Sequence, residues 1–216
     1  MLAYQLMPAA YAIEDLRKRR LKVSFLDDMN DPFELLSPRL ERAAHRIAFG
    51  KWREDINERT RVLCFSKSWS NPVLWSHYAD KHRGICLGFE IPDNCALEVQ
   101  YTSARLELQI EHELKKHGTI GTEIVNRLLT TKYVDWAYEQ EVRMFVRPQE
   151  TYQELGLQFY PFDSHLQLRR VVVGARSSVA LEEVEAAIQP QDQRVEVIPT
   201  RLAFQSYRVI KTPRKP

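Results

Sequence analysis

The chain has 216 residues, enough for one domain with a sizeable hydrophobic core. Its 31 basic and 29 acidic residues leave a formal net charge of +2, so no global attraction to nucleic acid or to an anionic membrane is expected. No apolar run reaches the length of a membrane span, no signal pattern opens the chain, and the three cysteines show no paired spacing. We therefore expect a cytoplasmic protein with reduced cysteines and no membrane association.

Apolar patterns along the chain predict a mixture of helices and strands in irregular order. The expected strands are residues 1–7, 21–25, 62–66, 85–91, 96–101, 142–146, 157–162, 168–173, 194–198 and 207–210. The expected helices start at Pro8, run from Ser37 to Asn57 with a bend near Gly50, span Pro72 to Tyr78, form two segments of 104–131 divided near Gly118, and span 178–188. Because helices and strands do not alternate regularly, we predict a single α+β domain over residues 1–216.

The most informative segment is residues 136–143, which carries Glu139 and Glu141 directly before an alternating run typical of a half-buried strand. In an extended segment, residues i and i+2 point to one side, so the two carboxylates should project together. Such a pair suits a cation, a sugar hydroxyl or acid–base chemistry. The alternative is a solvated strand face on which Arg143 balances the charge.

Two further segments carry polar groups. Residues 64–72 place Ser66 and several other polar side chains where a strand ends, either as a site or as simple turn chemistry. Residues 75–84 hold Trp75, His77 and Tyr78, but the histidines lack ligand spacing and no metal is expected. Nucleophile-elbow, phosphate-loop and dinucleotide motifs are absent from the sequence, and no cysteine lies in a reactive setting.

Three blocks together resemble a bacterial family, the domain-of-unknown-function family 2971. They are residues 25–34, 64–90 and 136–143, and in order and spacing they cover residues 1–150. This family is similar to the ADP-ribosyltransferase fold, so the resemblance implies a split antiparallel or mixed β-sheet core with flanking helices. Residues 151–212 would complete that fold.

The resemblance also implies an NAD-dependent ADP-ribosyltransferase that cleaves the nicotinamide–ribose bond. Tyr4 and Gln5 of the first strand would contact NAD, Ser66 would support Glu141 or bind the ribose, and Glu141 would stabilise the cationic ribose. Glu139 would act on the acceptor, which could be a protein or a nucleic acid.

Other residues would support this site. Tyr78 or Trp75 would stack on the nicotinamide, His77 would contact the cofactor, and Arg143 would pair with Glu141 or with a phosphate. As a toxin or anti-phage effector, the protein would have an antitoxin or another operon product as partner.

Two alternatives remain open from the sequence. ADP-ribosyltransferases usually carry His or Arg in the first strand, and residues 1–7 contain neither, which favours a non-catalytic binding module with an ion network. The basic clusters at 17–20 and 211–215 would suit a nucleic-acid-binding or nucleic-acid-processing protein, although the near-zero net charge argues against it.

Overall fold

The computed structural model of the chain describes residues 1–31, 33–107, 121–192 and 194–213. Within these residues, the central sheet has eight strands in the order β13-β12-β11-β4-β1-β3-β8-β5. Neighbouring strands are antiparallel except for β11 and β12, which are parallel. A mostly antiparallel mixed sheet with flanking helices confirms the predicted α+β class.

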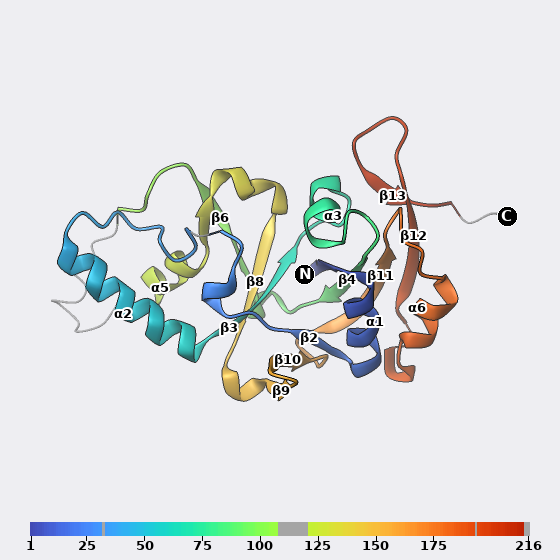
Figure 1. Cartoon of the computed structure of the whole chain (residues 1–216), viewed down its shortest axis with the longest axis horizontal. Helices are drawn as coiled ribbons and strands as arrows, with labels where there is room; N and C mark the ends of the chain where they lie inside the picture. Colours follow the sequence, from blue (N-terminus) through green and yellow to red (C-terminus); the bar gives the residue numbers. More distant parts are fainter. Residues whose placement is uncertain (32, 108–120, 193, 214–216) are drawn as a thin grey trace.

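The elements follow one another along the chain as in Figure 1. The strands of the central sheet are β1 (Leu2–Met7), β3 (Arg61–Ser66), β4 (Ile85–Glu90), β5 (Leu97–Glu98), β8 (Glu141–Val146), β11 (Gln167–Val173), β12 (Glu196–Leu202) and β13 (Val209–Lys211). Two smaller sheets contain β2 (Arg20–Lys22), β9 (Tyr152–Glu154) and β10 (Leu157–Pro161), and β6 (Gln100–Thr102) and β7 (Thr131–Tyr133). The described helices are α1 (Ala9–Lys18), α2 (Ala43–Arg59), α3 (Pro72–Tyr78), α5 (Thr122–Leu129) and α6 (Leu181–Ala187). In Figure 1, α2 and α5 lie at one end of the molecule and α1 and α6 at the other.

Several predicted boundaries were wrong. The helix expected from Ser37 begins instead at Ala43 and continues past Gly50 to Arg59, because Pro38 forms a bridge with Leu106. The strand predicted at 96–101 is two short strands, and the last two strands begin two residues later than expected. Of the two helices predicted in 104–131, α5 is present, whereas residues 108–120, with the dividing glycine, lie outside the described residues.

The two faces of the sheet differ in what covers them. One face carries a continuous apolar core in which Ala3, Phe65, Leu87 and Val142 pack with residues of α1 and α6. The opposite face carries two smaller apolar clusters, one around Trp75 of α3 and the other formed by Leu26, Leu35, Val62 and Leu129. Polar side chains of β3 and β8 point to this second face, so it offers the place for a site.

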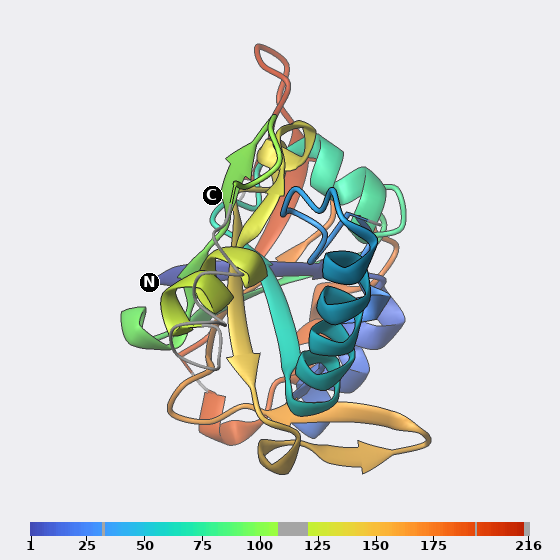
Figure 2. The same ribbon diagram turned by 90° about the vertical axis from the view of Figure 1, so that its left-hand side faces the viewer.

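The central sheet is nearly divided between β1 and β3. Among the described residues, these strands share one registered pair, Tyr4 with Ser66, whereas β1–β4 and β3–β8 each pair along their whole length. In Figure 2, β1 runs across the picture while β3 and β8 run down it. No helix in the described part of the chain is long and apolar enough to cross a membrane.

Candidate functional site

A cavity of about 220 Å³ opens beside the junction of β1 and β3. Its walls come from β1, β3, α3, β7 and the start of β8, together with the loop after β2. Six predicted site residues line it: Tyr4, Gln5, Ser66, Tyr78, Glu139 and Glu141. Residues far apart in the sequence therefore meet at one concave position, which is the usual form of a small-molecule site.

One row of paired residues crosses the sheet at this cavity. Arg170 of β11 pairs with Gly88 of β4, Gly88 with Tyr4 of β1, Tyr4 with Ser66 of β3, and Ser66 with Glu141 of β8. The Tyr4 ring lies over Gly88, and the Arg170 guanidinium donates a hydrogen bond to the Tyr4 hydroxyl at 2.7 Å. The row therefore places a guanidinium at one end and a carboxylate at the other.

Replacing Gly88 with alanine is expected to lower the free energy of unfolding by about 1–3 kcal/mol, as overpacking does in well-packed interiors. The added Cβ would lie 2.8 Å from Cε1 of Tyr4 and 3.1 Å from Cβ of Arg170. The matched control is Gly50→Ala in α2, where a Cβ meets nothing within 4 Å and stabilisation of up to about 1 kcal/mol is expected. Urea unfolding of both variants measures the difference, and equal effects would contradict the close contact at Gly88.

The two carboxylates do not share an extended segment, contrary to the sequence prediction. Glu139 ends the 3₁₀ turn Val134–Glu139, Gln140 has a left-handed φ of 47°, and Glu141 is the first residue of β8. They nevertheless reach one cation, because Nζ of Lys132 lies 2.7 Å from Oε2 of Glu139 and 3.1 Å from Oε2 of Glu141. The acidic pair is thus brought together by a bridging lysine rather than by strand periodicity.

Lys132 is the main site residue that the sequence did not reveal. It lies in β7, its side chain is buried, and its ammonium is 4.7 Å from the centroid of the Trp136 ring. Burial lowers its pKa, but Glu141, Glu139 and Glu34 raise it more, so the net shift is upward and the lysine stays charged. The only hint in the sequence was that this lysine lies seven residues before Glu139. A buried lysine almost always has a charged partner, and Glu139 is a candidate for that partner.

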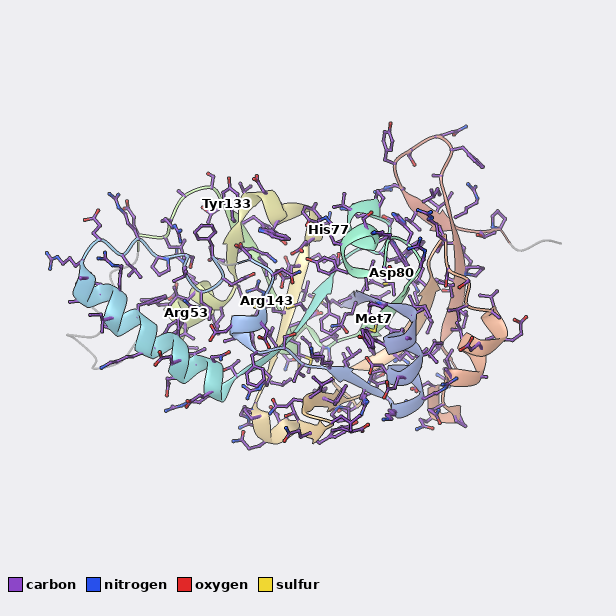
Figure 3. The ribbon with its side chains drawn as sticks, in the orientation of Figure 1. Met7, Arg53, His77, Asp80, Tyr133 and Arg143 are labelled. Carbon is purple, nitrogen blue, oxygen red and sulfur yellow. The ribbon has the colours of Figure 1, made fainter. Side chains whose placement is uncertain are left out.

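Arg143 lies beneath the cavity and does not line it. Its guanidinium donates to both carboxylate oxygens of Glu141, at 2.8 and 3.0 Å, to Glu34 at 2.7 Å and to the carbonyl oxygen of Leu129 at 2.6 Å. Figure 3 shows Arg143 in the interior beside β8. Of its two predicted roles, pairing with Glu141 is observed, whereas the fully buried side chain does not line the cavity in which a phosphate contact would be made.

These five groups form a buried network with unequal charges. Glu34, Glu139 and Glu141 face Lys132 and Arg143, which leaves one formal negative charge in excess when all five are ionised. Burial raises the pKa of Glu141, but Arg143 and Lys132 outweigh it and hold that pKa below its usual value. Burial raises the pKa of Glu34, whose Oε2 has no hydrogen-bond partner within the described residues. A negative excess in a dry setting suits a ligand or a transition state that carries positive charge.

Tyr78 completes the wall beside Glu139. Its hydroxyl donates to Oε1 of Glu139 and accepts a hydrogen bond from Nδ2 of Asn30 at 3.0 Å. Burial, together with Glu139, raises the pKa of Tyr78, so the phenol remains a donor at neutral pH. Asn71 caps α3 through the Val73 N–H and donates to the carbonyl oxygen of Tyr138, which holds the helix against the turn that carries Glu139.

Trp75 and His77 do not line the cavity, whereas Ser66 lines it without bonding to Glu141. Trp75 is fully buried in the cluster under α3, where its Nε1 donates to the carbonyl oxygen of Trp69. His77 lies on the exposed side of α3, where Nδ1 is 3.0 Å from the Tyr138 hydroxyl. Ser66 lines the cavity, but its hydroxyl bonds to the backbone of Ser68 rather than to Glu141. Helical periodicity explains the first two outcomes, because α3 turns these side chains away from the cavity.

The basic cluster at 17–20 is a helix end paired with acids rather than a free positive patch. Lys18 and Arg20 both contact Glu154, and Arg19 pairs with Asp192. Arg20 is buried. No group of His, Cys, Asp and Glu suited to a metal ion is present among the residues described.

The fold and cavity define an α+β protein with a buried acid–base network under a small pocket lined by polar and apolar side chains. Residues 74–144 match the model of the family described as Protein of unknown function (DUF2971), which confirms the resemblance to that family. The matched segment contains Tyr78, Lys132, Glu139, Glu141 and Arg143. No curated protein and no solved structure matches the chain.

Proposed function

We propose that the chain is an NAD-dependent ADP-ribosyltransferase-like protein whose site is the cavity at the β1–β3 junction. The observation that carries the proposal is the register row, in which Tyr4, Ser66 and Glu141 come from three neighbouring strands into one cavity. Glu139 and Tyr78 lie on the same cavity wall. A dinucleotide substrate would contact all three strands at once.

The chemistry follows from the negative excess around Glu141. When the bond between nicotinamide and C1 of the ribose breaks, its electron pair leaves with nicotinamide and the ribose becomes cationic. A fixed carboxylate stabilises that cation without needing to reorient, and Arg143 with Lys132 holds Glu141 ionised and in place. The acceptor then forms a new bond to C1 and loses a proton.

Glu139 is the group proposed to take that proton. It lines the cavity and lies within hydrogen-bond reach of Tyr78 and Lys132, so an acceptor hydroxyl or amine would replace part of this network. A cavity of about 220 Å³ is smaller than a drug-sized pocket and suits the nicotinamide–ribose end, with the remainder of NAD outside it. The acceptor is a protein or a nucleic acid, as for a toxin or anti-phage effector with an antitoxin or operon partner.

A non-catalytic binding module is the second candidate. Two observations favour it: both cavity carboxylates are already bonded to Lys132, and β1 carries neither His nor Arg. In that case the cavity would bind its ligand without breaking a bond, and the five-residue network would serve stability alone.

Titration of NAD into the purified protein, with nicotinamide release followed in the same samples, separates the two candidates. We expect binding and slow release from the natural sequence. Glu139→Gln should lower modification of an added acceptor by about 10²- to 10⁴-fold, as expected for loss of a general base, while slow hydrolysis by water persists. Equal loss of both reactions would refute the acceptor role of Glu139. If millimolar NAD produces no binding heat and no nicotinamide release, the binding module is the better description.

A further inference from the structure

A second cavity, of about 210 Å³, shares Lys132 with the first. It is formed by the loop before α2, the loop after β6 and strand β7, and Lys132 lines both cavities. Figure 3 shows Tyr133, one of its lining residues, near β6 and away from the hairpin between β12 and β13. Nothing in the proposed nicotinamide chemistry uses this space.

Ser37 lines the second cavity and has a buried hydroxyl without a partner among the described residues. Ser37 is only 9% exposed, and its Oγ has no hydrogen-bond partner among the residues that the structure describes. The Leu106 N–H donates to the carbonyl oxygen of Ser37 at 2.7 Å, which fixes the residue in place. Thr102 and Thr131 also line the cavity, but their hydroxyls bond to the carbonyl oxygens of Ala104 and Arg127. A hydroxyl that is buried without a partner carries a desolvation penalty, and rotation about χ1 of Ser37 would let this group bond to a ligand in the cavity.

Flat, apolar surfaces make up much of the remaining wall. Phe33 and Tyr133 line the cavity and are 54% and 46% exposed. The Arg105 guanidinium lies 4.8 Å from the Phe33 ring centroid and donates to the carbonyl oxygen of Leu36. Aromatic and guanidinium planes favour stacking with flat rings, and none of the lining residues within the described part of the chain is acidic. The site therefore disfavours a cationic ligand and favours a flat ring with hydrogen-bonding groups on its edge.

We propose that this second cavity binds a nucleobase, with the ring against Tyr133 and its edge hydrogen-bonded to the Ser37 hydroxyl. Two sources could supply such a ring: the base end of the same dinucleotide whose other end enters the first cavity, or a separate nucleotide. The first source rests on the proposed function and the second does not. In both, Lys132 lines the two binding positions.

Titration calorimetry with adenosine as the probe tests the proposal on the whole chain. Tyr133→Ala should weaken adenosine binding about tenfold or more, the loss typical of one stacked base. Ser37→Ala should weaken it about two- to tenfold, as expected for one hydrogen bond. The control is Phe204→Ala, which removes an aromatic ring that is 93% exposed and does not line the cavity, and it should bind like the natural sequence. Melting temperatures of all variants establish that they are folded.

The outcomes separate this proposal from the NAD chemistry. If adenosine and NAD compete, the ring in the second cavity is the base end of the dinucleotide. If they bind at the same time, the ring belongs to a separate nucleotide. Adenosine binding that Tyr133→Ala and Ser37→Ala weaken, without any nicotinamide release, supports the second cavity and not the proposed reaction. No adenosine binding, or equal affinity in all variants, overturns the second cavity even if NAD is consumed.

Discussion

Replacing Arg143 with methionine is expected to lower the free energy of unfolding by about 3–5 kcal/mol, the loss found when one partner of a buried ion pair is removed. The change would leave Glu141 and Glu34 buried without the guanidinium that bonds both of them, and would leave the carbonyl oxygen of Leu129 without this donor. At about 2–4 °C per kcal/mol for a chain of this length, the melting temperature should fall by roughly 6–20 °C. Urea and thermal unfolding measure both quantities.

The matched control for this substitution is Arg169→Met. Arg169 pairs with Glu90 at 2.7 Å, but both side chains are substantially exposed, so a loss of about 0–1 kcal/mol is expected. A double variant that combines Arg143→Met with Glu141→Gln should lose less than the sum of the single changes, because the second change removes a charge that the first leaves unpaired. Equal losses for Arg143→Met and Arg169→Met would contradict a buried network that stabilises the fold.

Replacing Glu141 with glutamine is expected to lower the rate of nicotinamide release about 10²- to 10³-fold, as losing one group that stabilises transition-state charge does. Glutamine keeps the size of the side chain but cannot carry the negative charge that the cationic ribose requires. Because the pKa of Glu141 is held below its usual value, the natural side chain is ionised at neutral pH, so the substitution removes a full charge. Two quantities are measured for the variant and for the natural sequence: the rate of nicotinamide release at saturating NAD, and the binding constant for NAD from calorimetry.

Glu90→Gln is the control for the loss of a carboxylate from the central sheet. Glu90 ends β4, is exposed and does not line the cavity, so the rate should not change. If Glu141→Gln retains the rate of the natural sequence while remaining folded, the carboxylate is misassigned and the ion network is structural. Weaker NAD binding with an unchanged rate would place Glu141 in ground-state binding instead.

The strands that the sequence predicted well are those with continuous apolar character. Residues 62–66 and 85–91 read as buried strands because their side chains face apolar layers on both sides of the sheet, and β3 and β4 lie there. The start of α2 was missed because its N-terminal residue, Arg42, makes no side-chain capping bond and the helix buries little apart from Phe49. Without an apolar stripe, the local pattern could not distinguish a helix starting at Ser37 from one starting at Ala43.

The site was predictable only in part, for a related reason. Glu139, Glu141 and Tyr78 belong to compact segments with an unusual density of polar and aromatic residues, and these segments can be recognised in the sequence. Glu34 and Arg143 are 109 residues apart and meet through the order of strands, which no local pattern encodes. Lys132 gave almost no signal because its burial depends on carboxylates from other elements.

The narrow connection between β1 and β3 has a mechanical consequence. With a single registered pair, few backbone hydrogen bonds resist a small rotation of one half of the sheet against the other. The continuous apolar core on the far face spans both halves and would act as the hinge, since Ala3, Leu87, Leu63 and Val142 all belong to it. The cavity lies on the face opposite this core, with Tyr4 in one half of the sheet and Glu141 in the other. A ligand that contacts both residues would restrict the rotation of the two halves. Binding in one small pocket would therefore reduce motion across the whole sheet, from β13 to β5.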